Sequence, residues 1–331
     1  MRRSVLVCDA DRYPSDVLEL LSTKFTVLRS IARDQKSLKN EIIDNQVEVL
    51  FCNLSTKIDA QLLDGANSLR YVVSPTTGLS HVDLSYLKAK GISIVFLGHV
   101  KSEIASVFAT AELAWALLLA VSRKVSLAAR STQLGEWHRE NFFGLSLSNK
   151  VIGVVGFGRL GRQVANYALA FGMKVLAYDV DDEVFVNMKR DVNRSGLEDL
   201  LAKSDFVSVH VALTEQSKNL ISRERVGQMK SGAVLINTSR GEIVDEDALV
   251  EAVKSGKLFG VGVDVLQSES DKNFEVMKSK LVEASNNGFN VLVTPHIGGW
   301  TGEAVYVTRL AITREFLNVY QKLDEHGKLI Y

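Results

Sequence analysis

Short apolar runs alternate with amphipathic stretches through the first hundred residues of the chain. The apolar runs predict strands at Ser4–Cys8, Phe25–Leu28, Val47–Cys52, Leu69–Val73 and Ile92–Phe96. Helical spacing of apolar positions marks the stretches Pro14–Ser22, Gln35–Ile43, Asp59–Leu63 and Asp83–Lys90. Strands that alternate with helices indicate βαβ units and a parallel sheet covered on both faces.

A second alternating series begins near Lys150. Its predicted strands are Val151–Val155, Lys174–Tyr178, Phe206–His210, Ala233–Asn237, Phe259–Val263 and Val291–Val293. Ser195 and Glu198 have the spacing of a capping box, and Asp245 is expected to cap a helix that Gly256 ends. A final amphipathic helix is predicted from Gly302 to Leu323. The fold class is therefore α/β, with doubly wound parallel sheets.

The composition narrows the class of protein. A chain of 331 residues is long enough for two domains. Its 39 basic and 39 acidic side chains balance, whereas a nucleic-acid-binding protein usually carries a basic excess, so we expect no nucleic-acid partner. The two cysteines, Cys8 and Cys52, cannot form a disulfide framework or a four-thiolate zinc site. We expect two buried free thiols and no metal site.

The lengths of the apolar segments also indicate where in the cell the protein is expected. The basic residues Arg2 and Arg3 precede an apolar run too short for a secretory signal. The segment Ile104–Val121 carries Glu112 near its middle, and its unbroken apolar part is about half as long as a membrane span requires. We expect a cytoplasmic protein without a membrane partner, in which this segment is a helix buried at a domain or subunit contact.

The segment Gly156–Gly161 carries the spacing G-x-G-x-x-G, with Arg159 and Leu160 before the last glycine. An isolated match of this kind is weak evidence, but here a predicted buried strand precedes it and a predicted helix follows. In that context Gly156 permits a tight turn, Gly158 admits a pyrophosphate to the backbone, and Gly161 allows close packing of helix and strand. The segment predicts a dinucleotide site.

The next predicted strand ends at Asp179, about 20 residues beyond the first glycine, where an acid is expected to bind the ribose 2′-hydroxyl of NAD. Val180, Asp181 and Asp182 follow, so no adjacent basic residue is available for a 2′-phosphate. The expected cofactor is NAD(H) rather than NADP(H).

Three further polar residues follow predicted strands: Arg240, Glu269 and His296. The carboxyl ends of parallel strands form one edge of the sheet, so these residues are expected on the edge that holds the glycine loop. Histidine can donate or accept a proton near neutral pH, a neighbouring carboxylate favours its charged form, and a guanidinium can bind a carboxylate and polarise a carbonyl. The combination predicts hydride-transfer chemistry on an oxygenated carbon. Taken singly, each residue has a structural alternative: a surface ion pair for Arg240, a solvated acid for Glu269 and a structural role for His296.

These motifs resemble those of the D-isomer-specific 2-hydroxyacid dehydrogenases, the family of phosphoglycerate dehydrogenase and glyoxylate/hydroxypyruvate reductase. The resemblance is strongest from about Lys150 to Gly299. It implies that Arg240 binds the substrate carboxylate and carbonyl, that Glu269 partners the histidine, and that His296 is the acid/base. It further implies cofactor contacts from Thr238, Ser239, Asp264 and Gly299, and substrate contacts from the backbone of Thr77, Gly78 and Leu79.

The resemblance also implies a domain arrangement. A Rossmann NAD domain, residues 101–299, would be inserted into a flavodoxin-like substrate domain made of residues 1–100 and 300–331. Members of the family commonly form homodimers through the NAD domain, and the helix Phe108–Val121 with the arm Ser122–Phe143 is similar to that contact.

Several positions depart from the family pattern. Ser270 stands where proline often follows the glutamate, Ala212 replaces a usual proline, and the segments 94–112 and 269–296 are long. The second of these segments contains a predicted helix at Phe274–Ala284. Asn53 occupies a position where phosphate-handling members tend to carry arginine, and Lys57 is a poorer phosphate ligand. Phosphoglycerate is therefore disfavoured as the substrate.

Two alternatives to a small 2-hydroxy or 2-keto acid dehydrogenase stay open at this point. One is an NAD(H)-sensing regulatory protein on the same fold, and the other is a relative that acts on formate or phosphite. Among the remaining histidines, we expect His210 to be structural or near the adenine, and His81 and His99 to lie on the surface.

Overall fold

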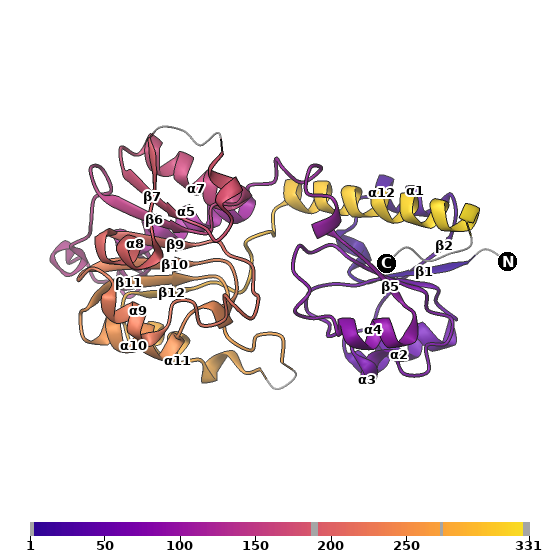
Figure 1. The fold of residues 1–331 in the computed structure, drawn as a ribbon. Helices are drawn as coiled ribbons and strands as arrows, with labels where there is room; N and C mark the ends of the chain where they lie inside the picture. Colours follow the sequence, from indigo (N-terminus) through magenta and orange to yellow (C-terminus); the bar gives the residue numbers. More distant parts are fainter. Residues whose placement is uncertain (1–2, 187–190, 272–273, 327–331) are drawn as a thin grey trace. The chain divides into compact units, whose positions relative to one another are not determined.

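The structure is a computed structural model that describes residues 3–186, 191–271 and 274–326, and it divides into two compact units (Figure 1). The first unit comprises Met1–Val107 and Trp300–Tyr331, and the second comprises Phe108–Gly299. Each unit is built on one parallel sheet with helices on both faces. This architecture confirms the predicted α/β class.

The first unit contains a five-stranded sheet in the order β2-β1-β3-β4-β5, and all its neighbours are parallel. Its strands are β1 (Ser4–Val7), β2 (Thr26–Arg29), β3 (Val49–Phe51), β4 (Tyr71–Ser74) and β5 (Ser93–Phe96). The central strands β3 and β4 are buried at every position, because helices cover both of their faces.

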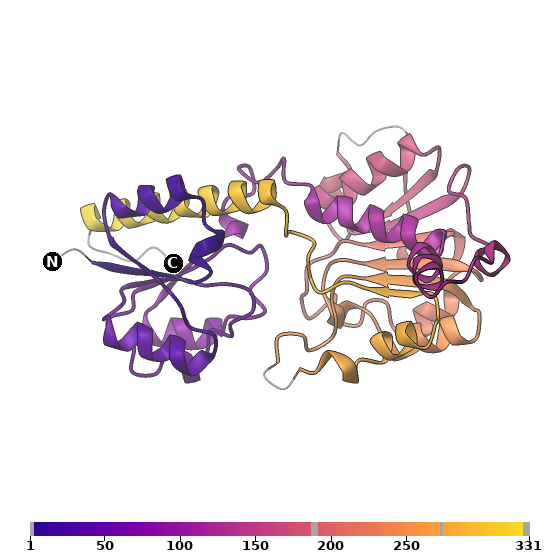
Figure 2. The same ribbon diagram turned by 180° about the vertical axis from the view of Figure 1, so that it is seen from behind.

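Helices from opposite ends of the chain cover one face of this sheet, as Figure 2 shows from behind. They are α1 (Ser15–Ser22) and α12 (Gly302–His326), whereas α2 (Gln35–Asp44), α3 (Ala60–Leu63) and α4 (Leu84–Lys90) lie on the other face. Phe316 and Tyr320 are one turn apart on α12, and their rings lie 5.6 and 4.8 Å from that of Phe25. The last helix thus completes the core of the first hundred residues.

The segment after β5 belongs to this first core. Leu97, Val100 and Ile104 are buried with the residues of α1 and α12. The boundary between the units therefore lies between Val107 and Phe108, whereas the sequence placed it between residues 100 and 101.

The second unit contains a seven-stranded parallel sheet in the order β12-β11-β10-β9-β6-β7-β8. Its strands are β6 (Val151–Val155), β7 (Lys174–Tyr178), β8 (Val192–Arg194), β9 (Phe206–Val209), β10 (Ala233–Asn237), β11 (Leu258–Val263) and β12 (Val291–Val293). The edge strand β8 was not predicted, because only Val192 in it is buried and it carries no apolar run.

Helices cover both faces of the second sheet. One face carries α5 (Ala109–Ser122) and α7 (Arg159–Ala170), and the other carries α8 (Leu197–Lys203), α9 (Arg223–Gln228), α10 (Glu246–Lys254) and α11 (Lys280–Asn286). The apolar helix α5 packs directly on the sheet, since a Cβ added at Gly262 would lie 3.2 Å from Leu117. Among the described residues, no helix combines the length and the apolar character that crossing a membrane requires.

Three local expectations need correction. The capping box at Ser195 is wrong: Gly196 is the cap of α8, and the Ser195 hydroxyl donates to the carbonyl of Gly196 instead. The predicted single helix at Phe274–Ala284 begins only at Lys280, after a short 3-10 turn at Val276–Lys278. By contrast, the Asp245 carboxylate accepts from the Ala248 amide and caps α10, as predicted.

The third wrong expectation is the surface position of His81, because this residue is buried and only 1% exposed. Its Nε2 lies 3.3 Å from the Ser74 hydroxyl, and polar groups at the end of β4 thereby compensate its burial. His99 is exposed, as expected, and Cys8 and Cys52 are buried free thiols, also as expected.

Candidate active site

The predicted site residues of the second unit follow five of its parallel strands. Gly156 follows β6, Asp179 follows β7, Thr238 follows β10 and Asp264 follows β11, and His296 lies three residues beyond β12. Because all these strands are parallel, their carboxyl ends meet at one edge of the sheet, where ligands of doubly wound folds bind.

The glycine loop has the close contacts that its sequence predicts. Gly156 has φ +93°, and a Cβ there would lie 2.6 Å from the carbonyl oxygen of His210. A Cβ on Gly161 would lie 2.0 Å from the carbonyl oxygen of Gly156. Gly158, in contrast, meets nothing within 4 Å, so its backbone is open to a ligand at the start of α7.

Asp179 lies against this loop. Its Oδ2 accepts from the Phe157 amide at 2.7 Å, and its Oδ1 accepts from the Asp181 amide at 3.0 Å. The two hydrogen bonds orient the carboxylate at the end of β7, beside the turn that begins α7. A half-buried acid in this place can accept from ribose hydroxyls.

An arginine that the sequence did not reveal lies near the end of β7. Arg194, on the unpredicted strand β8, pairs with Asp182, and its guanidinium stacks over the Phe185 ring at 5.1 Å. That ring in turn stacks on Phe157 of the glycine loop, with centroids 5.4 Å apart. Spacing along the chain could not show this residue, because only the pairing of β7 with β8 brings it here.

The residues at this edge fit a dinucleotide. The open backbone at Gly158, the beginning of a twelve-residue helix and the oriented carboxylate of Asp179 are suited to a pyrophosphate and a ribose. Farther along the edge, the Thr238 hydroxyl is buried without a hydrogen-bond partner among the described residues. Such a group needs a partner, and a bound amide or hydroxyl could supply one.

His210 lies behind the loop. Its Nε2 lies 2.8 Å from the Ser208 hydroxyl, and burial lowers its pKa from 6.5 to about 4. The ring is therefore neutral at physiological pH and does not titrate near neutrality.

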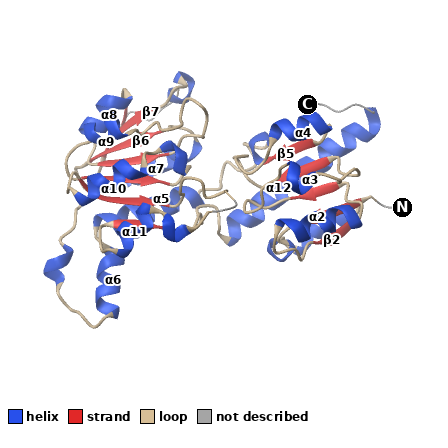
Figure 3. Ribbon diagram, turned by 90° about the horizontal axis from the view of Figure 1, so that it is seen from below, coloured by secondary structure: helices blue, strands red, loops and turns tan. Residues whose placement is uncertain are grey.

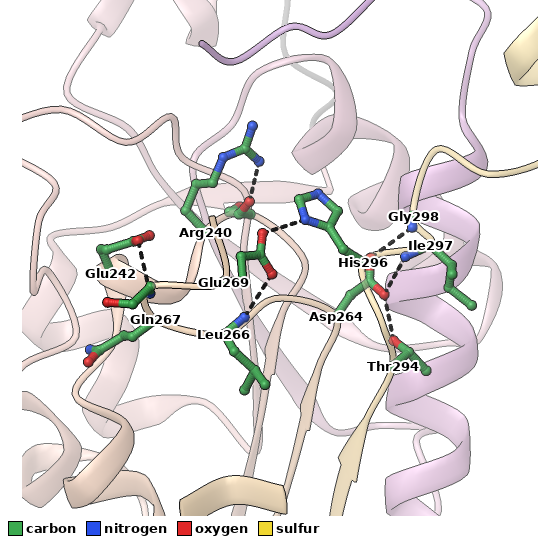
Figure 4. Close-up of polar contacts among 12 residues, drawn as sticks. Arg240, Glu242, Asp264, Leu266, Gln267, Glu269, Thr294, His296, Ile297 and Gly298 are labelled. Carbon is green, nitrogen blue, oxygen red and sulfur yellow. Dashed lines mark hydrogen bonds and ion pairs between the residues drawn. The ribbon is translucent and has the colours of Figure 1, made fainter. Parts of the chain in front are cut away.

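Glu269 and His296 meet at the same edge. The imidazole Nδ1 lies 2.5 Å from Oε1 of Glu269, whose Oε2 accepts from the Leu266 amide at 3.2 Å. A carboxylate at Nδ1 places the hydrogen on that nitrogen and leaves Nε2 free for a reacting oxygen. Figure 4 shows Glu269 between the His296 ring and the Arg240 guanidinium.

Asp264 organises the turn that carries His296. Its carboxylate accepts from the Thr294 hydroxyl at 2.6 Å and from the amides of Ile297 and Gly298 at 2.9 and 2.7 Å. The backbone of His296 has φ +54°, which is uncommon for a residue with a side chain. Asp264 thus stabilises the strained turn, a role that the sequence did not reveal; burial raises the pKa of its carboxyl group, whereas these hydrogen bonds lower it.

Arg240 lies three residues beyond the end of β10 and is half-buried. Its Nη1 donates to the Ser239 carbonyl at 2.6 Å, and its own carbonyl accepts from the Asn237 amide side chain at 2.8 Å. Burial lowers the pKa of the guanidinium, and the carboxylates of Glu269 and Glu242 oppose that change. The group remains a cation and is suited to bind an anion.

The predicted substrate loop of the first unit follows β4. The Thr76 hydroxyl donates to the Gly78 carbonyl at 2.7 Å and shapes the loop. Within the part of the chain that the structure describes, no acceptor is paired with the amides of Thr77, Gly78 and Leu79. Consecutive unpaired amides are suited to bind an anion.

Asn53 has a local role in the same unit. Its Oδ1 accepts from the Thr56 amide at 3.0 Å and closes a turn after β3. A neutral side chain engaged in this way offers little to a phosphate.

Comparisons with known proteins identify the family of the chain. The sequence model for "D-isomer specific 2-hydroxyacid dehydrogenase, NAD binding domain" matches residues 115–298, which lie within the second unit. The chain is 37% identical to hydroxypyruvate reductase of Thermotoga maritima over 78% of this chain and 80% of that protein. It is 34% identical to glyoxylate reductase of Thermococcus kodakarensis over 91% of this chain and 88% of the relative.

A solved structure extends the similarity to the whole fold. D-lactate dehydrogenase of Aquifex aeolicus, in complex with NAD and lactic acid, matches with a TM-score of 0.76 and 28% identity over 97% of this chain and 95% of that one. The chain therefore belongs to the D-isomer specific 2-hydroxyacid dehydrogenase family, and it is an NAD-dependent oxidoreductase.

Proposed function

We propose that the protein interconverts a small 2-keto acid and its D-2-hydroxy acid, with His296 as the acid/base. The observation that carries this proposal is the contact of His296 Nδ1 with Glu269 beside the Arg240 guanidinium. When bound, NAD(H) supplies or accepts the hydride. The second unit is the NAD domain in this proposal, and the first unit is the substrate domain.

Each of the three side chains has a different role in the proposed reaction. Arg240 binds the carboxylate and the adjacent carbonyl oxygen, because its cation attracts the negative carboxylate and stabilises the negative charge that develops on the carbonyl oxygen. His296 Nε2 donates a proton to that oxygen in the reductive direction and removes it in the oxidative direction. Glu269 holds the ring and stabilises its charged form. Within the first unit, the unpaired amides of Thr77, Gly78 and Leu79 are proposed to bind an anionic group of a ligand.

Glyoxylate and hydroxypyruvate are the substrates we favour. Two of the most similar relatives are named for these compounds. Phosphorylated substrates are disfavoured, because Asn53 is neutral and engaged in its own turn. A single exposed lysine, Lys57, is a weaker phosphate ligand than an arginine.

We also propose a homodimer formed through the second unit. The arm that follows α5 includes α6 (Val125–Gln133), and it extends away from the sheet in Figure 3. Leu134, Trp137 and Phe143 on this arm are 72, 86 and 84% exposed. Large apolar side chains gathered on one segment are typical of a protein contact.

The experiment that tests the function is NADH consumption with a panel of 2-keto acids: glyoxylate, hydroxypyruvate, pyruvate, a branched and an aromatic keto acid, 2-oxoglutarate and phosphohydroxypyruvate. We expect the highest kcat/KM with glyoxylate or hydroxypyruvate. Turnover of none of them, with NADH binding intact, would overturn the proposal and favour an NAD(H) sensor.

The same assay tests the acid/base. His296→Gln should lower kcat by about 10²- to 10⁴-fold, because proton transfer is lost, and should leave NADH binding nearly unchanged. NADH affinity measured by fluorescence titration is the control. An equal loss of NADH binding would contradict the assigned role.

A further inference from the structure

The loop that carries Glu269 lies outside regular secondary structure. It follows β11, and Glu269 stands six residues beyond Val263, with Ser268 before it at φ +59°. Within the loop, the Glu269 carboxylate accepts from the Leu266 amide and its own amide donates to the Leu266 carbonyl. These bonds orient Glu269 relative to the loop, but they do not attach the loop to the rest of the unit.

Two carboxylates make that attachment: Glu242 lies between β10 and α10, and Glu246 is the first residue of α10. Oε1 of Glu246 accepts from the Gln267 amide at 2.6 Å, and Oε1 of Glu242 accepts from the Ser268 amide at 3.4 Å (Figure 4 shows Glu242). The Gln267 side chain returns a hydrogen bond to the Val244 carbonyl at 2.8 Å. We call Glu242 and Glu246 the carboxylate clamp.

The clamp acts where the two backbones are in contact. A Cβ added at Gly241 would lie 2.1 Å from the Leu266 carbonyl carbon and 2.2 Å from the Gln267 nitrogen. Gly241 adjoins Arg240, so this contact sets the separation between the Arg240 backbone and the loop of Glu269. A displacement of the loop would therefore change the spacing of the substrate-binding and proton-transfer groups together.

The surroundings of Glu246 disfavour the charged form of its carboxylate. It is half-buried, and burial raises its pKa; the neighbouring carboxylates of Glu242, Asp247 and Glu269 raise it further, while the bond from Gln267 lowers it. Its position in the first turn of α10 favours a negative charge, but Asp245 and Asp247 already supply charge there. The short bond to Gln267 is what distinguishes Glu246 from those two acids.

We propose that Glu246, assisted by Glu242, is a positioning residue for the proton-transfer pair: it holds the loop Leu266–Ser268 so that Glu269 reaches His296. This inference rests on the proposed function, in which Glu269 supports His296 as the acid/base. Glu246 acts through the loop and contacts no reacting group.

The test compares Glu246→Ala, which removes the acceptor, with Glu246→Gln, which can still accept from the Gln267 amide. Glu246→Ala should lower kcat by about tenfold, as loss of a supporting contact commonly does. It should also move the alkaline limb of keto-acid reduction to lower pH, because Glu269 stabilises the charged imidazole less well. Glu246→Gln should recover most of kcat. Glu251 is on the same helix as Glu246, and Glu251→Ala breaks an exposed ion pair with Arg223 of α9. This variant is the matched control and should change neither quantity.

A double-mutant cycle separates positioning from general stability. In a Glu269→Gln background, Glu246→Ala should cost less than twofold in kcat, since the group it positions is already lost. Glu246→Asp, which keeps the charge but is shorter, provides the same comparison if the alanine variant does not fold.

The inference alone would be overturned if the effects of the Glu246 and Glu269 substitutions on kcat were fully additive. It would also be overturned if a folded Glu246→Ala or Glu246→Asp variant kept the pH profile of the wild-type protein. An unchanged pH profile in Glu269→Gln itself would overturn both the inference and the proposed role of Glu269.

Discussion

At the scale of single residues, the Asp179 carboxylate has a structural contact and a proposed binding role. It accepts from the Phe157 amide of the glycine loop, and the same group remains beside the place where a ribose would bind. The nearby Arg194 is held by Asp182 and by the Phe185 ring. We therefore expect the preference between the two nicotinamide cofactors to depend on Arg194 as well as on Asp179.

Asp179→Ala should weaken NADH binding by at least tenfold and weaken NADPH binding less, so that the NADH/NADPH preference falls. The physical reason is the loss of a hydroxyl acceptor and of a charge that repels a 2′-phosphate. Dissociation constants for both cofactors, measured by fluorescence titration, check the expectation. Asp181→Ala is a neighbouring control that should leave the ratio in place, and an unaltered ratio in Asp179→Ala would show that the acid does not contact the ribose.

The three proposed reacting residues show what position along the chain can predict. Arg240, Glu269 and His296 were expected at strand ends because parallel strands bring their carboxyl ends together. The supporting roles of Asp264, Glu242 and Glu246 were not foreseen, because they depend on hydrogen bonds to backbone amides of other segments. Residue types alone do not specify such contacts.

At the scale of elements, the turn from β6 into α7 uses its glycines for different reasons. Gly161 is needed for packing within the unit, because a Cβ at this position would lie only 2.0 Å from the carbonyl oxygen of Gly156. Gly158 has free space around it and a φ that any residue can adopt. Its absence of a side chain is therefore of use to a ligand rather than to the fold.

The two glycines should consequently respond differently to alanine. Gly161→Ala should lower the free energy of unfolding by about 1–3 kcal/mol, since the helix must move away from the loop. Gly158→Ala should leave stability almost unchanged and reduce NADH affinity by tenfold or more, because its methyl group occupies the approach to the pyrophosphate. Thermal unfolding without cofactor, together with NADH titration, distinguishes the cases.

Gly227→Ala in α9 is the control for the substitution itself, since its Cβ also meets nothing within 4 Å. It should shift the Tm by no more than a few degrees and leave the NADH affinity unchanged. Equal stability losses in the Gly161 and Gly158 variants would contradict the division of roles.

At the scale of the whole molecule, two sheets form two separate cores. The second core is continuous in sequence, from Phe108 to Gly299, whereas the first is made from both ends of the chain. Phe316 and Tyr320 on α12 pack against Phe25, so the first core is incomplete until the last helix is present. The arm after α5, in contrast, leaves its apolar residues exposed.

The proposed dimer can be tested on that arm. Trp137→Ser combined with Phe143→Ser should convert a dimer into a monomer, because two large apolar contacts are lost. Light scattering coupled to size-exclusion chromatography measures the mass. Ile31→Ser, at an equally exposed apolar residue of the first unit, is the control and should not alter the mass. A monomeric wild-type protein, or a variant that remains dimeric, would refute the proposed contact.

The order and type of most elements, the glycine turn and the strand ends that carry the proposed reacting groups could be predicted from the sequence. Hydrophobic periodicity and glycine conformation are local properties, and parallel strands align their carboxyl ends. The groups that support those residues are known only from the folded chain. The edge strand β8 with Arg194, the buried His81, the Asp264 turn and the carboxylate clamp each depend on pairing between different segments of the chain. Such pairing follows from the packing of the whole unit, and no local pattern records it.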